Sequence, residues 1–419
     1  MKSHAHAHEL HDTEQSVWEL SAIQLSGWTS LPILATSLLI LQQNSFYGSI
    51  MTIIVGNAIL WFIRLGIILM TYKKRKSTLD ISRDYLGNFG SYFIGTLLIL
   101  ATLAWFIAQT TAASNTLTQL IAIEEHPSIN KFVQMSVLLG ILSTFLCMEG
   151  IVALKKLATW TFPFLLAAFV VILVTVPFKL PPQNNAALSL AGLSLVLGSS
   201  LGITSDMPTF FRHSKSLTSS IIALTIVQVM SLALAIASLF FGAIISNSFE
   251  VNSAAVLSAS NLLLRIALIV FLFLSAICAN VANVYSASVG WEVIAPKSLV
   301  GRKEYLILGL GLTTIFIMIP NALSAKFLVV ALEATDTSLV NLCIILIIGY
   351  ILNRQTEHQP NAFHQRVNFT AWLLSTLVTT FLYLQHTPMA LSPLTVGFII
   401  VLLTILTSFV VRRIIRWCF

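Results

Sequence analysis

A tryptophan and a glutamine lie one helical turn apart in the middle of a long apolar run. Trp105 and Gln109 are at i and i+4, so both side chains project from one face of a helix. An indole offers a flat apolar surface, and a carboxamide offers two donors and an acceptor. The pair therefore suits a planar polar heterocycle that stacks and hydrogen-bonds at its edge. The alternative, a core tryptophan beside a glutamine that joins two helices, is equally open.

Two asparagines follow the same logic in a later apolar run. Asn280 and Asn283 are at i and i+3, so they face one direction. Two amides on one turn in hydrocarbon are costly without partners. They would bind the polar edge of a substrate or help to coordinate a cation; the alternative is hydrogen bonding between helices.

Two apolar runs contain glycines and small hydroxyl residues that a plain membrane anchor would not need. One is the segment 198–202 with the sequence Gly-Ser-Ser-Leu-Gly, and the other is 27–32, Gly-Trp-Thr-Ser-Leu-Pro. Lipid cannot solvate unpaired backbone groups, so a broken helix survives only beside protein or a water-filled cavity. We therefore predict two discontinuous helices with a binding site between them near the midplane.

Four charged residues are candidates for gating. Asp206 follows the segment 198–202 and precedes Arg212, so it would cap a helix start or pair with Arg212 near the cytoplasmic face. A gating or structural role suits it better than substrate contact. Glu333 and Asp336, at i and i+3 near the outer end of a later run, are candidates for an outer gate or for proton handling.

The remaining polar features favour structural interpretations. Arg64 and Glu149 lie close enough to the ends of their runs to reach an interface by extending their side chains. The histidines of the N-terminal tail form an alternating cluster without ordered surroundings, which argues against a physiological metal site. The cysteines form no metal-type pair, and no nucleophile–base motif or phosphate-binding loop occurs, so we expect neither an enzyme nor a resident cofactor.

The composition is that of a polytopic membrane protein. Of 419 residues, 57% are hydrophobic and 9% are charged, whereas soluble domains carry about 25% charged residues. The net charge of +7 resides mostly in short connectors, where it sets topology, so we expect a lipid bilayer and no nucleic acid as partner.

Apolar runs of about 20 residues predict an all-α protein with twelve membrane spans. They lie near 20–41, 48–71, 91–121, 131–153, 157–177, 187–211, 217–246, 262–290, 304–321, 326–352, 368–386 and 392–415. With the N-terminus in the cytoplasm, six clusters of lysine and arginine fall on the cytoplasmic side and only single basic residues fall outside. This bias predicts that both termini are cytoplasmic.

The similar breaks in spans one and six indicate an internal repeat. Five spans separate them, so the two halves would have opposite orientations, as in a five-plus-five inverted repeat. The predicted organisation is a cytoplasmic tail (1–19), a first repeat (20–180), a second repeat (181–355) and two further spans (356–419).

The ordered set of these residues resembles the nucleobase:cation symporter-1 family, in particular its cytosine/purine permease branch. The resemblance covers nearly the whole chain and is clearest at 105–109, at 204–212 and at 283–287. It implies a LeuT-like fold with a substrate site between spans 1, 3, 6 and 8.

The resemblance also implies roles for individual residues. Trp105 would stack on the substrate ring and Gln109 would bind its edge, while Ser199, Ser200 and Asn280 or Asn283 would complete a polar rim. A cation would lie between the first-span break and the eighth span. The positions for that cation are Gly27, Ser30, Leu31, Cys278 and Ala279.

Two positions depart from the family pattern. Leu197 occupies a position where the family often has a second aromatic residue, so the stacked ring would have one aromatic face. Cys278 and Ala279 replace hydroxyl residues beside the cation, although sodium is a hard cation that prefers oxygen ligands. A carbonyl or an asparagine would substitute, or coupling would be to protons, or the protein would not couple at all.

We therefore predict a permease of the inner (cytoplasmic) membrane that imports a nucleobase-like heterocycle by alternating access, coupled to Na⁺ or H⁺. The alternatives are a LeuT-like transporter for another small solute, such as an amino acid or a hydantoin-like ring, and a sensor that binds ligand without transport.

Overall fold

The chain is almost entirely helical in the part that the structure describes. The computed structural model describes residues 14–29, 36–41, 44–122, 128–176, 188–241, 261–318, 325–353, 362–385 and 396–406. Among these residues the only pairing between extended segments is a single bridge that joins Gln15 to Ser214.

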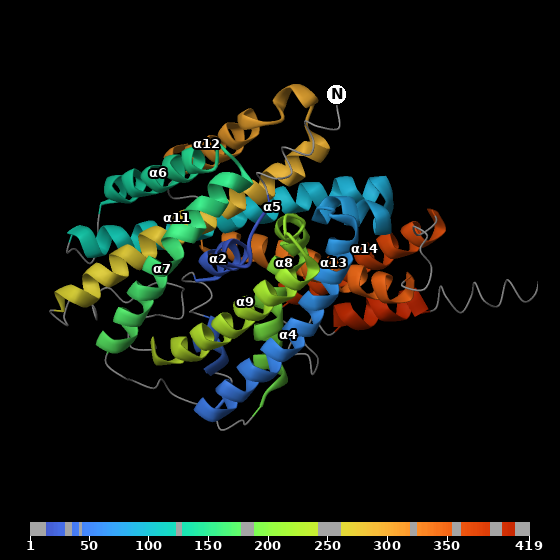
Figure 1. Cartoon of the computed structure of the whole chain (residues 1–419), viewed down its shortest axis with the longest axis horizontal. Coiled ribbons are helices and arrows are strands. Elements are labelled where there is room, and N and C mark those ends of the chain that lie inside the picture. Colours follow the sequence, from blue (N-terminus) through green and yellow to red (C-terminus); the bar gives the residue numbers. More distant parts are fainter. Residues whose placement is uncertain are drawn as a thin grey trace, which may run out of the picture.

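The helices coincide with the predicted spans to within a few residues (Figure 1). Their bounds are α2 (Val17–Trp28), α4 (Phe46–Lys74), α5 (Thr78–Ala122), α6 (Ile129–Leu146), α7 (Ile151–Thr175), α8 (Leu190–Phe211), α9 (Leu217–Ser238), α11 (Leu262–Ile294), α12 (Arg302–Met318), α13 (Ala325–Asn353) and α14 (Ala362–Leu384). Single 3-10 turns follow α9 (η1, Leu239–Phe241) and α11 (η2, Lys297–Leu299), and residues 36–41 and 396–406 are also helical.

Small polar residues start many of these helices. Ser16 and Glu19 form a capping box at α2, in which each side chain binds the other residue's backbone N–H. Ser45, Ser189 and Ser216 accept a hydrogen bond from the third residue of the helix that each precedes. The boundaries are therefore encoded locally, by side chains that satisfy backbone groups that the helix cannot.

A glycine divides α5 into a short connector helix and a long span. Gly87 has φ 78° and ψ 177°, a conformation that favours glycine and interrupts the helix. Residues 78–86 thus form a separate helix within the basic connector, and the span begins after Gly87. This connector helix was not predicted from the sequence.

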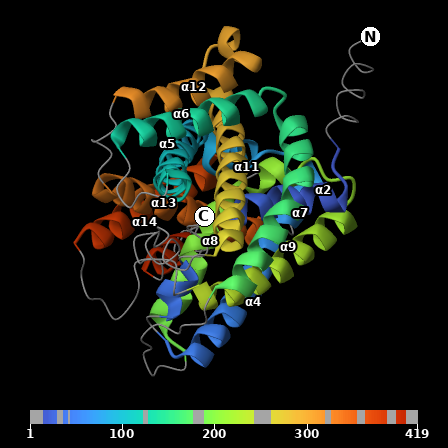
Figure 2. The ribbon, with the colours of Figure 1, turned by 90° about the vertical axis from the view of Figure 1, so that its left-hand side faces the viewer.

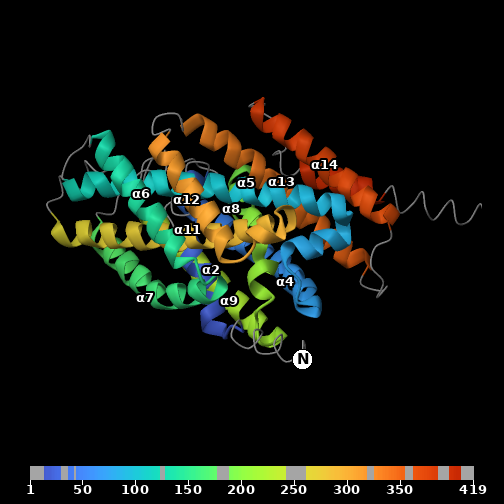
Figure 3. The same ribbon diagram turned by 90° about the horizontal axis from the view of Figure 1, so that it is seen from above.

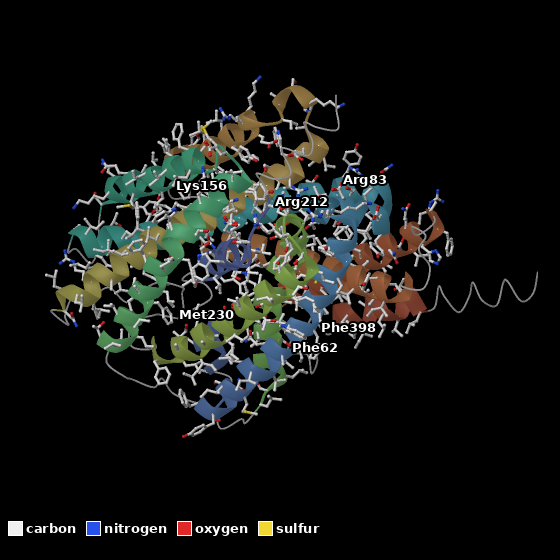
Figure 4. The ribbon with its side chains drawn as sticks, in the orientation of Figure 1. Phe62, Arg83, Lys156, Arg212, Met230 and Phe398 are labelled. Carbon is white, nitrogen blue, oxygen red and sulfur yellow. The ribbon has the colours of Figure 1, made fainter. Side chains whose placement is uncertain are left out.

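The protein is a multi-pass membrane protein. Seven of the described helices are long and apolar enough to cross a membrane: α4, α5, α6, α7, α8, α9 and α11. Large apolar side chains such as Phe62, Trp160 and Val174 are 69%, 74% and 78% exposed on the outside of the bundle, and Figure 4 shows Phe62 at its edge. Such a surface suits lipid rather than water.

The packing is organised around the contact of α5 with α11, which lie side by side along their lengths (Figures 1 and 3). The helix pair α4 and α9 lies on one side, and α6 with α12 on another (Figure 2). The contacts form matching pairs: α2 packs against α7 and α9, while α8 packs against α13 and α4. Likewise α11 packs against α7, and α5 packs against α13.

The contact between α6 and α12 depends on two glycines that face two threonines. A side chain on Gly309 would collide with Thr144, and one on Gly140 would collide with Thr313. Each threonine hydroxyl donates to a carbonyl four residues earlier in its own helix, which fixes the side chain. The two backbones therefore approach closely, as small residues allow in membranes.

Replacing Gly309 by alanine is expected to lower the free energy of unfolding by about 1–3 kcal/mol, because the added methyl group has no room. The matched control on the same helix is Gly311→Ala, since a side chain there meets no atom within 4 Å. It should leave stability unchanged or raise it slightly, because alanine favours helix. Thermal unfolding of the two purified variants measures the difference; equal melting temperatures would contradict the close approach.

The predicted break in the sixth span is wrong. Helix α8 runs without interruption from Leu190 to Phe211, through the segment 198–202. The hydroxyls of Ser199, Thr204 and Ser205 donate to carbonyls three or four residues earlier, at 3.2, 2.7 and 2.6 Å. Small hydroxyl residues can thus satisfy themselves within a helix, so their presence alone does not unwind it.

Candidate functional site

The first span is interrupted where the sequence predicts it. Helix α2 ends at Trp28, and both the backbone N–H and the hydroxyl of Thr29 bind the Leu25 carbonyl, at 2.8 and 2.6 Å. The next described residues, 36–41, are helical. The predicted cation positions Ser30 and Leu31 lie outside the described residues. Gly27 faces open space, with no atom within 4 Å of a side chain placed there.

A small cavity with a mixed polar and apolar lining lies beside the end of α2. Its volume is about 50 Å³, enough for a few water molecules. Residues from α2, the segment 36–41, α4, α8 and α9 line it: Trp28, Thr36, Ser37, Ile40, Ile53, Asn57, Val196, Ser199, Ser200, Ile203, Ser231 and Ala235. The structure thus brings Ser199 and Ser200 together with both ends of the first-span break. Leu197 is not among the lining residues and packs against the apolar core.

A buried arginine lies next to the cavity, where sequence reasoning placed it at the interface. Arg64 is fully buried. Its Nε donates to the Thr204 hydroxyl at 3.0 Å and its Nη1 donates to the Gln228 side-chain oxygen at 2.5 Å. The guanidinium carbon lies 4.0 Å from the centre of the Trp28 ring, in a cation–π contact. The interpretation that the Arg64 side chain extends to the membrane interface is therefore wrong, because residues of α2, α8 and α9 enclose it.

A second polar group lies between α5 and α11. Asn280 donates to the Thr110 hydroxyl at 2.8 Å, which is the interhelical bond that the sequence left open. Three further amide atoms are buried without a hydrogen-bond partner: the oxygens of Gln109 and Asn280 and the nitrogen of Asn283. Because buried amides normally bond, these atoms are available to a ligand. Trp105 lies one turn before Gln109 on the same helix.

The candidate residues thus form two groups. Ser199 and Ser200 line the cavity, whereas Trp105, Gln109, Asn280 and Asn283 do not. Helix α2 contacts both α9, which contributes to the cavity, and α11, which carries the asparagines.

Cys278 joins three helices where the cation was predicted. Its sulfur lies 2.9 Å from the Thr161 hydroxyl and also interacts with the Ser26 side chain. Both hydroxyls donate to carbonyls of their own helices. Oxygen atoms are therefore present around Cys278, but the position itself offers sulfur, and Ala279 offers only its backbone carbonyl.

Asp206 ties three elements together through hydroxyls. Its carboxylate accepts hydrogen bonds from Thr78 at the start of α5, from Thr209 one turn later in α8, and from Ser286 in α11. None of the described ion pairs joins Asp206 to Arg212, which was one of the two alternatives for this residue; the described hydrogen bonds of its side chain join it to hydroxyls within the helix bundle.

Arg212 caps the end of α8, near the middle of the view in Figure 4. It donates to the Tyr285 hydroxyl at 3.5 Å and to the His213 ring at 3.2 Å. Burial opposes its charge, but Tyr285 and the acidic residues around it raise the pKa of Arg212 above its ordinary value. Burial, together with Arg212 and Arg75, lowers the pKa of His213 to about 3, so His213 is neutral at physiological pH.

The segment before α2 crosses the same end of the bundle. The Gln15 N–H donates to the His213 carbonyl at 2.9 Å. Glu19 pairs with Lys155 of α7 at 3.6 Å, and Glu14 pairs with Arg75 after α4 at 3.7 Å. Residues 14–19 therefore connect α4, α7 and the α8–α9 connector.

Two further predicted residues have no described side chain. Glu333 and Asp336 lie on α13, but their side chains fall outside the described part of the structure. Glu149 is exposed and lies 4.0 Å from Lys156, in keeping with the interface position expected for it.

Several solved transporters share this fold. Mhp1, a nucleobase-cation-symport-1 family transporter, in a closed conformation with bromovinylhydantoin bound, matches with a TM-score of 0.69 at 17% identity, over 95% of this chain and 92% of that chain. A Na⁺-coupled sialic acid symporter matches with 0.67 at 12% identity, over 93% and 88%. A manganese transporter from Eremococcus coleocola matches with 0.54 at 14% identity, over 94% and 92%. No family model and no curated protein sequence matches the chain.

The chain therefore has the fold of membrane transporters that include cation-coupled symporters. Within that class, the fold of a nucleobase-cation-symport-1 transporter extends over nearly all of it, as the resemblance in sequence implies. At these sequence identities the likeness defines only the fold, so the substrate must be inferred from the residues of the site.

Proposed function

We propose that this protein is a secondary active transporter that imports a nucleobase-like planar heterocycle, such as cytosine or a purine, by alternating access. The observation that carries the proposal is the set of three buried amide atoms without a hydrogen-bond partner on the packed helices α5 and α11, of which the Gln109 oxygen lies one turn from Trp105. In this proposal the indole stacks on the ring and the amides bind its edge. The bromovinylhydantoin bound to Mhp1 is also a planar polar ring, which supports this substrate class.

The helix contacts support a five-plus-five inverted repeat. If α2, α4, α5, α6 and α7 correspond to α8, α9, α11, α12 and α13, the larger contacts between different elements have counterparts. The contact α2–α7 corresponds to α8–α13, α2–α9 to α8–α4, and α5–α13 to α11–α7. In such folds one bundle rocks against the other around a central site. Here α8 would move as a continuous helix, so only the first span contributes an interruption.

The proposed orientation places both termini in the cytoplasm and the connections of residues 14–19 at the inner end. Asp206, Arg212 and residues 14–19 make contacts between elements at this end. Inward release would require these contacts to break.

The coupling ion is Na⁺ or H⁺ in this proposal, and the residue at 278 gives a direct test. Cys278→Ser would add an oxygen beside Thr161 and Ser26, which suits a hard cation better than sulfur does. We expect Na⁺ to raise the melting temperature of this variant by several degrees, through binding to the folded form, and to affect the wild type less. Choline serves as the control cation. An equal response of both proteins to Na⁺ would show that position 278 does not touch the ion.

The function itself is tested by uptake into proteoliposomes. Radiolabelled cytosine, adenine, hydantoin and an amino acid are offered with inward Na⁺ or H⁺ gradients, or with none. Concentrative, gradient-dependent uptake of a heterocycle is the expected result. If only the amino acid accumulates, the protein is a transporter of amino acids and not of heterocycles. Binding without accumulation would favour a sensor.

A further inference from the structure

Arg64 carries a charge in a place where a neutral side chain would suffice to hold the helices. It lies ten residues before the end of α4, inside a helix that spans the membrane, and it is fully buried. Ionisable groups at such depth are costly and mark functional sites by default. A neutral glutamine could also bind the Thr204 hydroxyl and the Gln228 amide, without the cost of burying a charge.

The described partners of Arg64 leave its charge uncompensated. Thr204, Gln228 and the Trp28 ring are all neutral, and none of the described ion pairs includes Arg64. Its Nη2 is buried without a hydrogen-bond partner. A guanidinium whose Nη2 amino group is unused is a ready donor to a carboxylate, whose geometry matches it well.

The cavity does not touch Arg64 itself, but its lining is joined to the guanidinium through shared side chains and hydrogen bonds. Trp28 lines the cavity and also stacks with Arg64. Asn57 lines it as well, and both its backbone carbonyl and its side-chain oxygen accept from the Gln228 amide that binds Arg64. On α8, Ser200 lines the cavity, and its carbonyl accepts from the hydroxyl of Thr204. Along α4, α8 and α9, Arg64 and its two hydrogen-bond partners therefore lie one or two helical turns from the residues that line the cavity.

We propose that Arg64 makes this cavity a subsite for an anionic group, a carboxylate, on the transported solute. The inference rests on the proposed function and narrows its substrate class to planar heterocycles that carry an acidic substituent. The hydroxyls of Ser200 and Ser231 donate to the carboxylate, and Arg64 supplies the positive charge. The carboxylate and the guanidinium attract each other more strongly in this buried position than they would in bulk water.

The test compares ring pairs that differ only in the acid group. Binding of uracil and of uracil-6-carboxylate is measured by calorimetry on the full chain in nanodiscs, together with the methyl ester of the acid as an uncharged analogue of similar size. We expect the acid to bind about 10- to 100-fold more tightly than uracil or the ester, the usual advantage of a charged hydrogen bond. An acid that binds no better than its ester overturns the proposal.

Variants of Arg64 then assign the preference. Arg64→Met should remove the 10- to 100-fold advantage while uracil binds as before, and Arg64→Lys should retain part of it. The matched control is Arg83→Met, which removes an exposed arginine that lies 3.8 Å from Asp80. A preference that survives in folded Arg64→Met overturns the proposal. Should that variant not fold, the comparison of acid with ester in the wild type decides alone.

Different results would refute the anionic subsite and the proposed transport of heterocycles. Uracil binding that depends on Gln109, without preference for the acid, refutes the anionic subsite and leaves the proposed transporter of heterocycles in place. Failure of all three rings to bind refutes both.

Discussion

Replacing Gln109 by alanine is expected to abolish uptake of the substrate heterocycle while the protein still folds. The Gln109 oxygen is buried without a hydrogen-bond partner, so the folded protein loses no described bond from it. The bound substrate would lose a hydrogen bond and leave a polar edge unsatisfied. Such a loss costs about 1–3 kcal/mol, and together with the displaced ring it reduces uptake by about 100-fold or more.

The measurement is radiolabelled uptake at equal expression, with the melting temperature of the purified variant as the check on folding. Gln119→Ala is the matched control, because Gln119 lies on the same helix ten residues further on. It should transport normally. Normal uptake by Gln109→Ala would remove this residue from the site, and a large drop in its melting temperature would point to a structural role instead.

The helices could be predicted because hydrophobicity and capping are local properties of the chain. Serines 45, 189 and 216 each mark a helix start, and the apolar runs give the lengths. The break after Trp28 was also accessible, because Pro32 and the preceding small residues combine in one short segment. The resemblance to one transporter family then indicated the fold, which the likeness to Mhp1 confirms.

What the sequence concealed depends on contacts between distant segments. Segment 198–202 has the composition of a break, but its hydroxyls bond within the helix and α8 continues. Arg64 lies near enough to a basic connector to suggest an interfacial residue, yet its partners come from α2, α8 and α9. One signal was available: Thr204, Gln228 and Asn57 are polar residues at the middle of apolar runs, and a buried arginine needs such partners.

The predicted substrate site was also only partly accessible from the sequence. The resemblance in sequence implied that Gln109 and the asparagines of α11 share one site, and the structure shows Asn280 bound to Thr110, the residue after Gln109. It could not show that Ser199 and Ser200 face a separate cavity with Trp28 and Asn57. The roles of all these residues in binding stay predictions, which the substitutions above test.

Replacing Asp206 by alanine is expected to open the end of the helix bundle where residues 14–19 lie and to destabilise the protein. The carboxylate accepts hydrogen bonds from residues of α5, α8 and α11, so its loss releases three elements from one another. Ser286 loses its described acceptor, whereas Thr78 can still donate to the Ser205 carbonyl. Hydrogen bonds to a charged group contribute about 1.5–3 kcal/mol each, so we expect the free energy of unfolding to fall by about 2–4 kcal/mol.

Glu149→Ala is the control for charge, because Glu149 is 58% exposed and its pairing distance to Lys156 is 4.0 Å. It should change stability by less than about 0.5 kcal/mol. Asp206→Asn keeps one oxygen as an acceptor. It should lower the free energy of unfolding by less than Asp206→Ala does and by more than Glu149→Ala does.

Thiol accessibility distinguishes opening from simple destabilisation. Cys147, Cys278 and Cys343 are buried, so in a Cys418→Ser background the protein should react slowly with a water-soluble maleimide. Asp206→Ala should react faster well below its melting temperature, because water then reaches the interior between α8 and the α5–α11 pair. A substrate that binds the closed form should slow the reaction again. Unchanged labelling in a folded but less stable variant would restrict Asp206 to a structural role and exclude it from the gate.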